Sequence, residues 1–233
     1  MKQRIIKISG FILISFFVLS LSITITINFI PLYAFDINYL NISTYVDIPR
    51  EQILANYRIL LDYLNSPWIS ELDMPDFPSS NSGLFHFLEV KKLFLLNYLI
   101  LTISGTGTFF FLVYAKNKKL YKSFLLYFQF GILLSLTIIV TIIIRFDALF
   151  LLFHQTFFNN DAWLFNPATD PIILVLPAEF FMHNFLLAFG LVEMFLVVGY
   201  VIAKIEIRNQ DNLTQRKGLI RQIGVENEFS TVK

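Results

Sequence analysis

Two histidines in separate apolar segments are the residues of this sequence best suited to chemistry. His86 lies in LFHFLEVKKLF and His154 in LLFHQTFFNNDAWLF. An imidazole titrates near neutral pH, at about 6.5 when unperturbed, so it can both accept and donate a proton. A single histidine in an apolar segment is usually structural. Two that reach a matching depth from separate loops favour acid–base chemistry.

Other kinds of site are less well supported by the sequence. His86, Glu89, His154 and Asp161 all carry metal-ligand atoms, but no H-E-x-x-H or dense ligand cluster accompanies them. The chain has no cysteine and no G-x-S-x-G, so neither a thiol nor a serine nucleophile is indicated. We therefore expect no metal and no cofactor, and we interpret His183 as structural.

The composition is that of an integral membrane protein. The chain has 233 residues, of which 56% are hydrophobic and 17% aromatic, and only 15% are charged, against about 25% charged residues in soluble domains. A net charge of +1 argues against nucleic acid as a partner. Four segments have the roughly 20 apolar residues that cross a bilayer.

These segments predict an all-α membrane protein with four transmembrane helices and a mostly helical extracellular cap. The first segment is expected to be retained as an anchor, because no small-residue cleavage site follows it. The predicted division is 1–33 for the first transmembrane helix, 34–92 for an extracellular cap loop with an amphipathic helix, 93–144 for the second and third transmembrane helices, 145–179 for an extracellular re-entrant or interfacial segment, 180–203 for the fourth transmembrane helix and 204–233 for a cytoplasmic tail.

Basic residues predict the orientation. Most of the 18 Lys and Arg residues flank the first segment, lie in the hairpin KNKKLYK or belong to the tail. Cytoplasmic flanks carry such an excess, so we expect a multi-pass protein with both ends inside and its site facing the extracellular side of the cell membrane. Lys91 and Lys92 break this rule, and we expect them to snorkel to the interface or to meet acids of the first loop.

The predicted cap contains one clear helix. Pro49, Arg50 and Glu51 form a helix start, and apolar residues then recur at helical spacing until Ser66 and Pro67. This amphipathic helix is expected to lie flat on the outer leaflet or to cap the bundle.

Two polar features of the spans have structural interpretations. Ser104, Gly105, Thr106 and Gly107 would allow close helix packing rather than bind phosphate. An ionisable residue such as Glu193 is costly within a span. We expect it to be protonated and hydrogen-bonded to Gln129 or Thr137.

Three stretches resemble the lipoprotein intramolecular transacylase family of Gram-positive bacteria. They are LFHFLEVKKLF before the second span, LLFHQTFFNNDAWLFNPATDPIILVLPAEFF between the third and fourth spans, and NYRILLDYLNSPW in the cap. The resemblance covers nearly the whole chain up to about Lys204. It implies a four-span membrane acyltransferase with an extracellular cap, whose paired histidines carry over to His86 and His154.

The activity that this resemblance implies is an acyl transfer within one substrate molecule. The sn-2 acyl chain of a diacylglyceryl-modified lipoprotein moves to the α-amino group of its N-terminal cysteine, which leaves a lyso-form lipoprotein. One histidine would act as the base, and the other would donate to the oxyanion or relay a proton. The expected partners are such lipoproteins and membrane lipids, and the sequence leaves the oligomeric state open. Four further residues, all in the turn after His154, are predicted to position the substrate or stabilise the oxyanion: Asn159, Asn160, Asp161 and Trp163.

Two alternatives from other classes remain open on sequence alone. One is a metal-dependent membrane lipid hydrolase, and the other is a non-catalytic membrane assembly subunit in which the histidines are structural.

Overall fold

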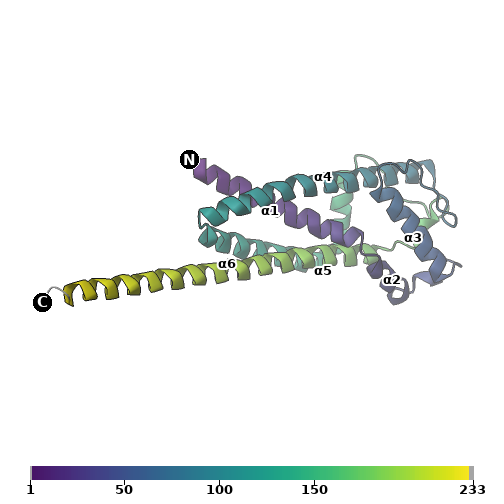
Figure 1. Ribbon diagram of the computed structural model, residues 1–233. Coiled ribbons are helices and arrows are strands. Elements are labelled where there is room, and N and C mark those ends of the chain that lie inside the picture. Colours follow the sequence, from purple (N-terminus) through teal and green to yellow (C-terminus); the bar gives the residue numbers. More distant parts are fainter. Residues whose placement is uncertain (1, 231–233) are drawn as a thin grey trace.

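The computed structural model describes residues 2–230, and all of the regular secondary structure in that range is helical. Four long helices form a bundle, and the shorter elements gather at one end of it (Figure 1). In chain order the elements are α1 (Lys2–Ile27), α2 (Ile30–Tyr39), the 3-10 helix η1 (Ile42–Thr44), α3 (Arg50–Asn65), α4 (Asn81–Asn117), α5 (Tyr121–Phe157), the 3-10 helix η2 (Pro171–Leu174) and α6 (Ala178–Ser230).

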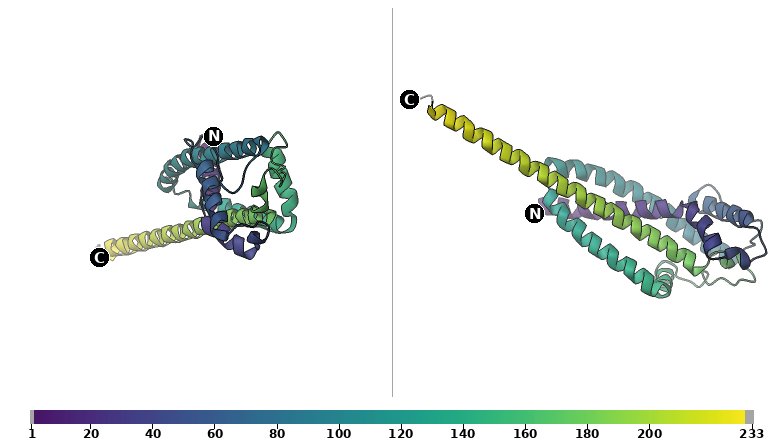
Figure 2. Two further views of the ribbon diagram at one scale, coloured as in Figure 1. Left: turned by 90° about the vertical axis from the view of Figure 1, so that its right-hand side faces the viewer. Right: turned by 90° about the horizontal axis from the view of Figure 1, so that it is seen from below.

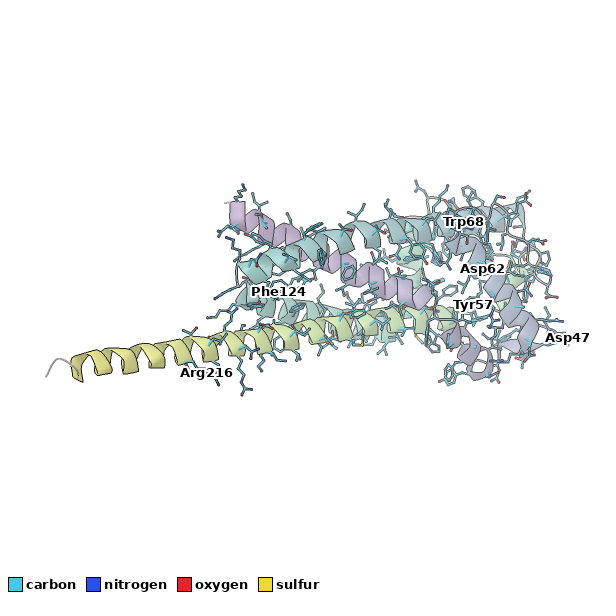
Figure 3. All side chains as sticks on the ribbon, viewed as in Figure 1. Asp47, Tyr57, Asp62, Trp68, Phe124 and Arg216 are labelled. Carbon is cyan, nitrogen blue, oxygen red and sulfur yellow. The ribbon has the colours of Figure 1, made fainter. Side chains whose placement is uncertain are left out.

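Helices α1, α4, α5 and α6 are long and apolar enough to cross a membrane. Large apolar side chains cover their outward faces, among them Ile103, Phe110, Phe130 and Ile144, each at least 60% exposed. Such faces are stable against lipid tails rather than water. The predicted all-α, four-helix membrane architecture is therefore confirmed. Beyond the bundle α6 continues alone, and Arg216 lies on that extension (Figure 3).

Close approach of α1 and α4 depends on small residues. A Cβ on Gly107 would lie 2.9 Å from Leu13, and one on Gly10 would lie 2.2 Å from the ring of Phe111. Ser104 is buried in the same contact region and donates to the carbonyl of Ile100 within its own helix. The packing interpretation of the Ser104–Gly107 run is confirmed.

The cap is a packed unit with its own apolar core. Its buried residues come from α2, η1, α3, the start of α4, η2 and the start of α6. At its centre the ring of Tyr33 stacks on Tyr57 at 3.9 Å and meets Phe180 edge-on at 5.0 Å. Tyr57 and Trp68 lie at the cap end of the molecule and Phe124 lies toward the opposite end (Figure 3). The predicted amphipathic helix is confirmed as α3, which packs its apolar stripe into this core.

Four helix bounds differ from the predicted segments. Helix α4 begins at Asn81 rather than near 93, α6 continues past 203 to Ser230, and the other two differences are in α1 and α5. The first long helix ends at Ile27, and after Asn28 and Phe29 the chain continues as α2. Pro31 stands in the first turn of α2, where its missing N–H costs least. Helix α5 continues past Ile144 to Phe157, so the segment after 144 begins as helix rather than as a loop.

A kink in α5 falls at Arg145, where the φ and ψ angles of −135° and 32° are not helical. Beyond it the last turns of α5 cross from α6 toward the start of α4 (Figure 2). Phe150 and Phe153 pack on Phe181 and Phe185 of α6 along this crossing. The kink therefore decides where His154 ends up.

Two predicted polar contacts are different in the structure. Glu193 accepts a hydrogen bond from Ser135 of α5, not from Gln129 or Thr137, because Ser135 lies on the face that α5 turns toward α6. Lys91 is buried rather than snorkelling. Its ammonium donates to the carbonyl of Ile69 and lies 4.2 Å from the centroid of the Tyr63 ring.

Candidate active site

The two predicted histidines meet at the cap end of the bundle. His86 lies in the second turn of α4 and His154 in the last turn of α5, and their ring centroids are 6.0 Å apart with an angle of 30° between the planes. Both residues are buried, with 7% and 8% of their surface exposed. Rings at this distance are neighbours, so one reacting group beside them can contact both.

One hydrogen bond defines the tautomer of His154. Its Nδ1 lies 2.8 Å from the backbone carbonyl oxygen of Phe150, one turn earlier in α5. A carbonyl oxygen can only accept, so Nδ1 carries the hydrogen. In the neutral ring Nε2 then has a free lone pair. His154 is therefore arranged to accept a proton at Nε2.

His86 presents a different situation. Its Nδ1 is buried and has no hydrogen-bond partner among the described residues. The ring is enclosed by aromatic side chains, with Phe158 at 4.6 Å and Phe165 at 5.5 Å between centroids, both edge-on. A buried polar atom without a partner is costly, and such atoms are frequent at catalytic sites. Nδ1 of His86 thus keeps an unsatisfied hydrogen-bonding position among the described residues.

Of the predicted positioning residues, Trp163 contacts this pair directly, and Asn160 contacts Glu89, one helical turn from His86. The indole of Trp163 lies 4.6 Å from the His154 ring, centroid to centroid. The amide nitrogen of Asn160 donates to both carboxylate oxygens of Glu89 on α4, at 3.0 and 3.2 Å, and its amide oxygen accepts from the backbone N–H of Ala162. This bridge holds the turn after α5 against the face of α4 that carries His86.

The other two predicted residues of the turn lie outward. Asn159 and Asp161 are exposed, and neither side chain makes a hydrogen bond with the residues that the structure describes. Among residues 2–216, whose side chains the structure describes, no group of three or more His, Asp or Glu side chains is arranged to hold a metal ion. The ligand set considered from the sequence is therefore not assembled here.

A buried carboxylate that the sequence did not single out anchors the start of α4. Asp170 is 3% exposed and accepts hydrogen bonds from the backbone N–H of Ser80 at 2.8 Å, the hydroxyl of Ser80 at 2.9 Å and the hydroxyl of Thr169 at 2.7 Å. The Ser80 oxygen in turn accepts from the backbone N–H of Gly83 and caps the helix. Six residues after this cap stands His86.

The third histidine, interpreted as structural, has a partner far away in the sequence. Nδ1 of His183 lies 2.7 Å from Oδ1 of Asp36, which is fully buried in α2. Burial raises the pKa of Asp36, and the hydrogen bond with His183 opposes that shift. The pair joins α2 of the cap to the start of α6, and the described contacts of His183 include neither of the two paired imidazoles.

Replacing Gly83 by alanine should disturb the anchor below His86. A Cβ at this position would lie 2.2 Å from Oδ1 of Asp170, so that carboxylate must give up hydrogen bonds to make room. Each hydrogen bond to a charged group contributes about 1.5–3 kcal/mol. We expect a lower thermal unfolding midpoint in detergent and at least a roughly tenfold loss of activity, since a small displacement of a catalytic group is enough for that.

Gly190 in α6 provides the matched control, because a Cβ there meets no atom within 4 Å. Gly190→Ala should keep both the midpoint and the activity. Equal midpoints and equal activities for the two variants would show that the Asp170 anchor does not position His86.

Fold and site together define a multi-pass membrane protein with a helical cap and a buried pair of imidazoles at the junction between cap and bundle. The comparisons with known proteins agree with this class. The chain belongs to the lipoprotein intramolecular transacylase family, since the family model described as "Lipoprotein intramolecular transacylase Lit" matches residues 8–181. No curated protein sequence matches the chain.

Solved structures extend the match over the fold. The membrane integral lipoprotein intramolecular transacylase Lit from Bacillus cereus is 30% identical, with a TM-score of 0.84 over 89% of this chain and 97% of that chain. Two further structures of the Bacillus cereus protein carry a histidine replaced by arginine or by alanine. Both are 29% identical to this chain, with a TM-score of 0.78. Each match covers 89% of this chain, and the matches cover 93% of the arginine variant and 94% of the alanine variant.

The family assigns the activity at a coarse level. The chain is a membrane-bound acyltransferase with lipoprotein intramolecular transacylase activity. The family assignment decides against the two alternatives considered from the sequence, a metal-dependent lipid hydrolase and a non-catalytic assembly subunit.

Proposed function

We propose that the chain moves the sn-2 acyl chain of a diacylglyceryl-modified lipoprotein to the α-amino group of its N-terminal cysteine, with His86 and His154 as acid–base catalysts at the outer leaflet. The observation that carries the proposal is the meeting of two buried imidazoles from different helices, with ring centroids 6.0 Å apart, in a member of a transacylase family. The resemblance of the sequence motifs implies the same pair.

The first step is activation of the amine. An α-amino group has a reference pKa of about 7.7–8.0, so much of it is protonated and inert at neutral pH. The ammonium form first gives one proton to water, and only the resulting neutral amine attacks the sn-2 ester carbonyl. The free Nε2 of His154 accepts the second proton, which the nitrogen loses as the new bond forms. His86 donates to the oxygen that becomes negative in the tetrahedral intermediate. The assignment rests on the different hydrogen-bonding of the two rings.

The second step breaks the ester. The bond between the acyl carbon and the glycerol sn-2 oxygen cleaves, and that oxygen takes the proton held by the His154 imidazolium. The products are an amide on the cysteine nitrogen and a free sn-2 hydroxyl, so no other reactant is needed. Since amine and ester belong to one molecule, no covalent enzyme intermediate is needed, and alignment of the two groups supplies much of the acceleration.

The remaining site residues have positioning roles in this scheme. Asn160 and Trp163 hold the turn after α5 against Glu89 and against the His154 ring. Asn159 and Asp161 are exposed and so are available to bind the peptide part of the substrate.

The proposed orientation places the cap outside the cell. The hairpin between α4 and α5, the start of α1 and the extension of α6 all lie at the end opposite the cap (Figure 1). Basic residues concentrate there, and Lys7 donates to Ser123 across this end. The positive-inside rule then gives an N-in, C-in protein with its site at the outer leaflet.

The direct test is expression in a bacterial host that produces diacylglyceryl-modified lipoproteins, followed by mass spectrometry of their N-terminal lipopeptides. We expect a new species that carries one acyl chain on the cysteine nitrogen and one on the glycerol. The proposal would be contradicted if the lipoproteins kept both acyl chains on glycerol although expression of the protein in the host membrane was confirmed.

A further inference from the structure

Glu89 is a half-buried carboxylate next to the imidazole pair that the acid–base scheme does not use. It follows His86 by three residues on α4, so the two side chains share one face of the helix. Both of its oxygens accept from the single amide nitrogen of Asn160, at 3.0 and 3.2 Å. A carboxylate offers about four acceptor positions, so this bond leaves room for a further donor.

The carboxylate has no cationic partner among the described residues. In that part of the chain the ion pairs join Arg50 to Glu51 and His183 to Asp36. Lys91, two residues away on the same helix, points to the carbonyl of Ile69 and the ring of Tyr63 instead. An acid placed at the junction of cap and spans without a cation is costly unless a ligand supplies the charge.

We propose that Glu89 binds the α-ammonium group of the substrate's N-terminal cysteine, an assignment that rests on the proposed function. An ammonium group has three donors and no acceptor, which suits a carboxylate with free lone pairs. Held one helical turn from His86, the nitrogen lies beside the imidazole pair, in which His154 accepts a proton during the attack and His86 donates to the oxyanion. Glu89 thus selects the lipoproteins whose N-terminus is still free.

The same contact accounts for product release. Once acylated, the nitrogen belongs to a secondary amide, which carries no charge and keeps only one of the three N–H donors of the ammonium group. In the product complex Glu89 therefore has no charged partner, and its carboxylate is bonded only to Asn160. This favours replacement of the product by a new substrate that carries a charged amine. Asn160 holds the Glu89 carboxylate in place. Trp163, in the same turn, packs on His154, so the turn also positions the carboxylate relative to both imidazole rings.

The test measures binding without turnover. The probe is a synthetic glyceryl-cysteinyl peptide with an ether in place of the sn-2 ester, which cannot transfer an acyl group, made with a free α-amine and with an N-acetylated one. The purified protein in nanodiscs should bind the free-amine probe more tightly. Glu89→Gln keeps an oxygen that accepts from Asn160 but removes the charge, and it should reduce that preference by roughly tenfold or more.

Two further variants separate charge from structure. Glu89→Asp keeps the charge and should keep the preference, whereas Asn160→Ala removes the bridge but keeps the carboxylate and should also retain a preference for the free amine. If Glu89→Gln discriminates between the two probes as well as the wild type does, with a wild-type unfolding midpoint, the inference is wrong.

The outcome is separable from that of the proposed function. Loss of discrimination in Glu89→Gln would support amine binding even if the lipopeptide spectra showed no transfer to nitrogen. Transfer to nitrogen with undiminished discrimination in Glu89→Gln would leave the proposed reaction standing and overturn the role of Glu89.

Discussion

Replacing His154 by alanine should lower the rate of lyso-form production by about 10²–10⁴-fold, the contribution of a positioned acid–base group. The ring is held by the bond from its Nδ1 to the Phe150 carbonyl and by Trp163, with Nε2 left free. Alanine removes the group that accepts the proton from the attacking nitrogen and later returns it to the sn-2 oxygen. The measurement is the initial rate of lyso-form appearance, by mass spectrometry, with purified protein in nanodiscs and a diacylglyceryl lipopeptide.

Two companion variants sharpen the result. Gln155→Ala changes the exposed neighbour on the same helix and should keep the wild-type rate. His154→Gln offers an amide that forms hydrogen bonds but does not take up a proton, so it should be nearly as slow as alanine. A His154→Gln rate near that of the wild type would mean that His154 acts through hydrogen bonding alone and that the base lies elsewhere.

The bundle and the cap helix could be predicted from the sequence because each depends on local pattern. Four apolar runs of the length of a bilayer and a Pro49-led amphipathic stretch are enough to give the spans and α3. The two histidines stood out by residue type and by the motifs that contain them. Their contact could not be predicted, since it depends on the kink at Arg145, and no proline or glycine at that residue marks it.

The polar contacts that support the site could not be predicted from the sequence for a different reason. They join residues that are 71 to 147 positions apart, namely Asn160 with Glu89, Asp170 with Ser80, and His183 with Asp36. Asp and Asn are common in loops, so residue type alone does not distinguish a buried anchor from an exposed turn residue. Gly83 was one possible signal, because a glycine in the first turn of a helix suggests that something approaches closely. Asp170 is what approaches.

Replacing His86 by alanine should reduce lyso-form production by about 10²–10³-fold, the cost of losing one donor to an oxyanion. Its Nδ1 has no partner among the described residues, so alanine breaks no hydrogen bond there and opens a small space among Phe158 and Phe165. The protein should therefore stay folded, with an unfolding midpoint close to that of the wild type. A large fall in the midpoint with full activity per folded molecule would assign His86 a packing role instead.

The double variant His86→Ala/His154→Ala decides whether the two rings form one catalytic unit. Groups that act in the same step are strongly non-additive, because once one is lost the other has little left to stabilise. We expect the double variant to be no more than about tenfold slower than the slower single variant, far from the product of the two single losses. The rings are 6.0 Å apart and face the same reacting atoms in the proposed scheme. Fully multiplicative losses would instead mean that the histidines serve separate steps, with His86 acting in substrate binding and His154 in proton transfer.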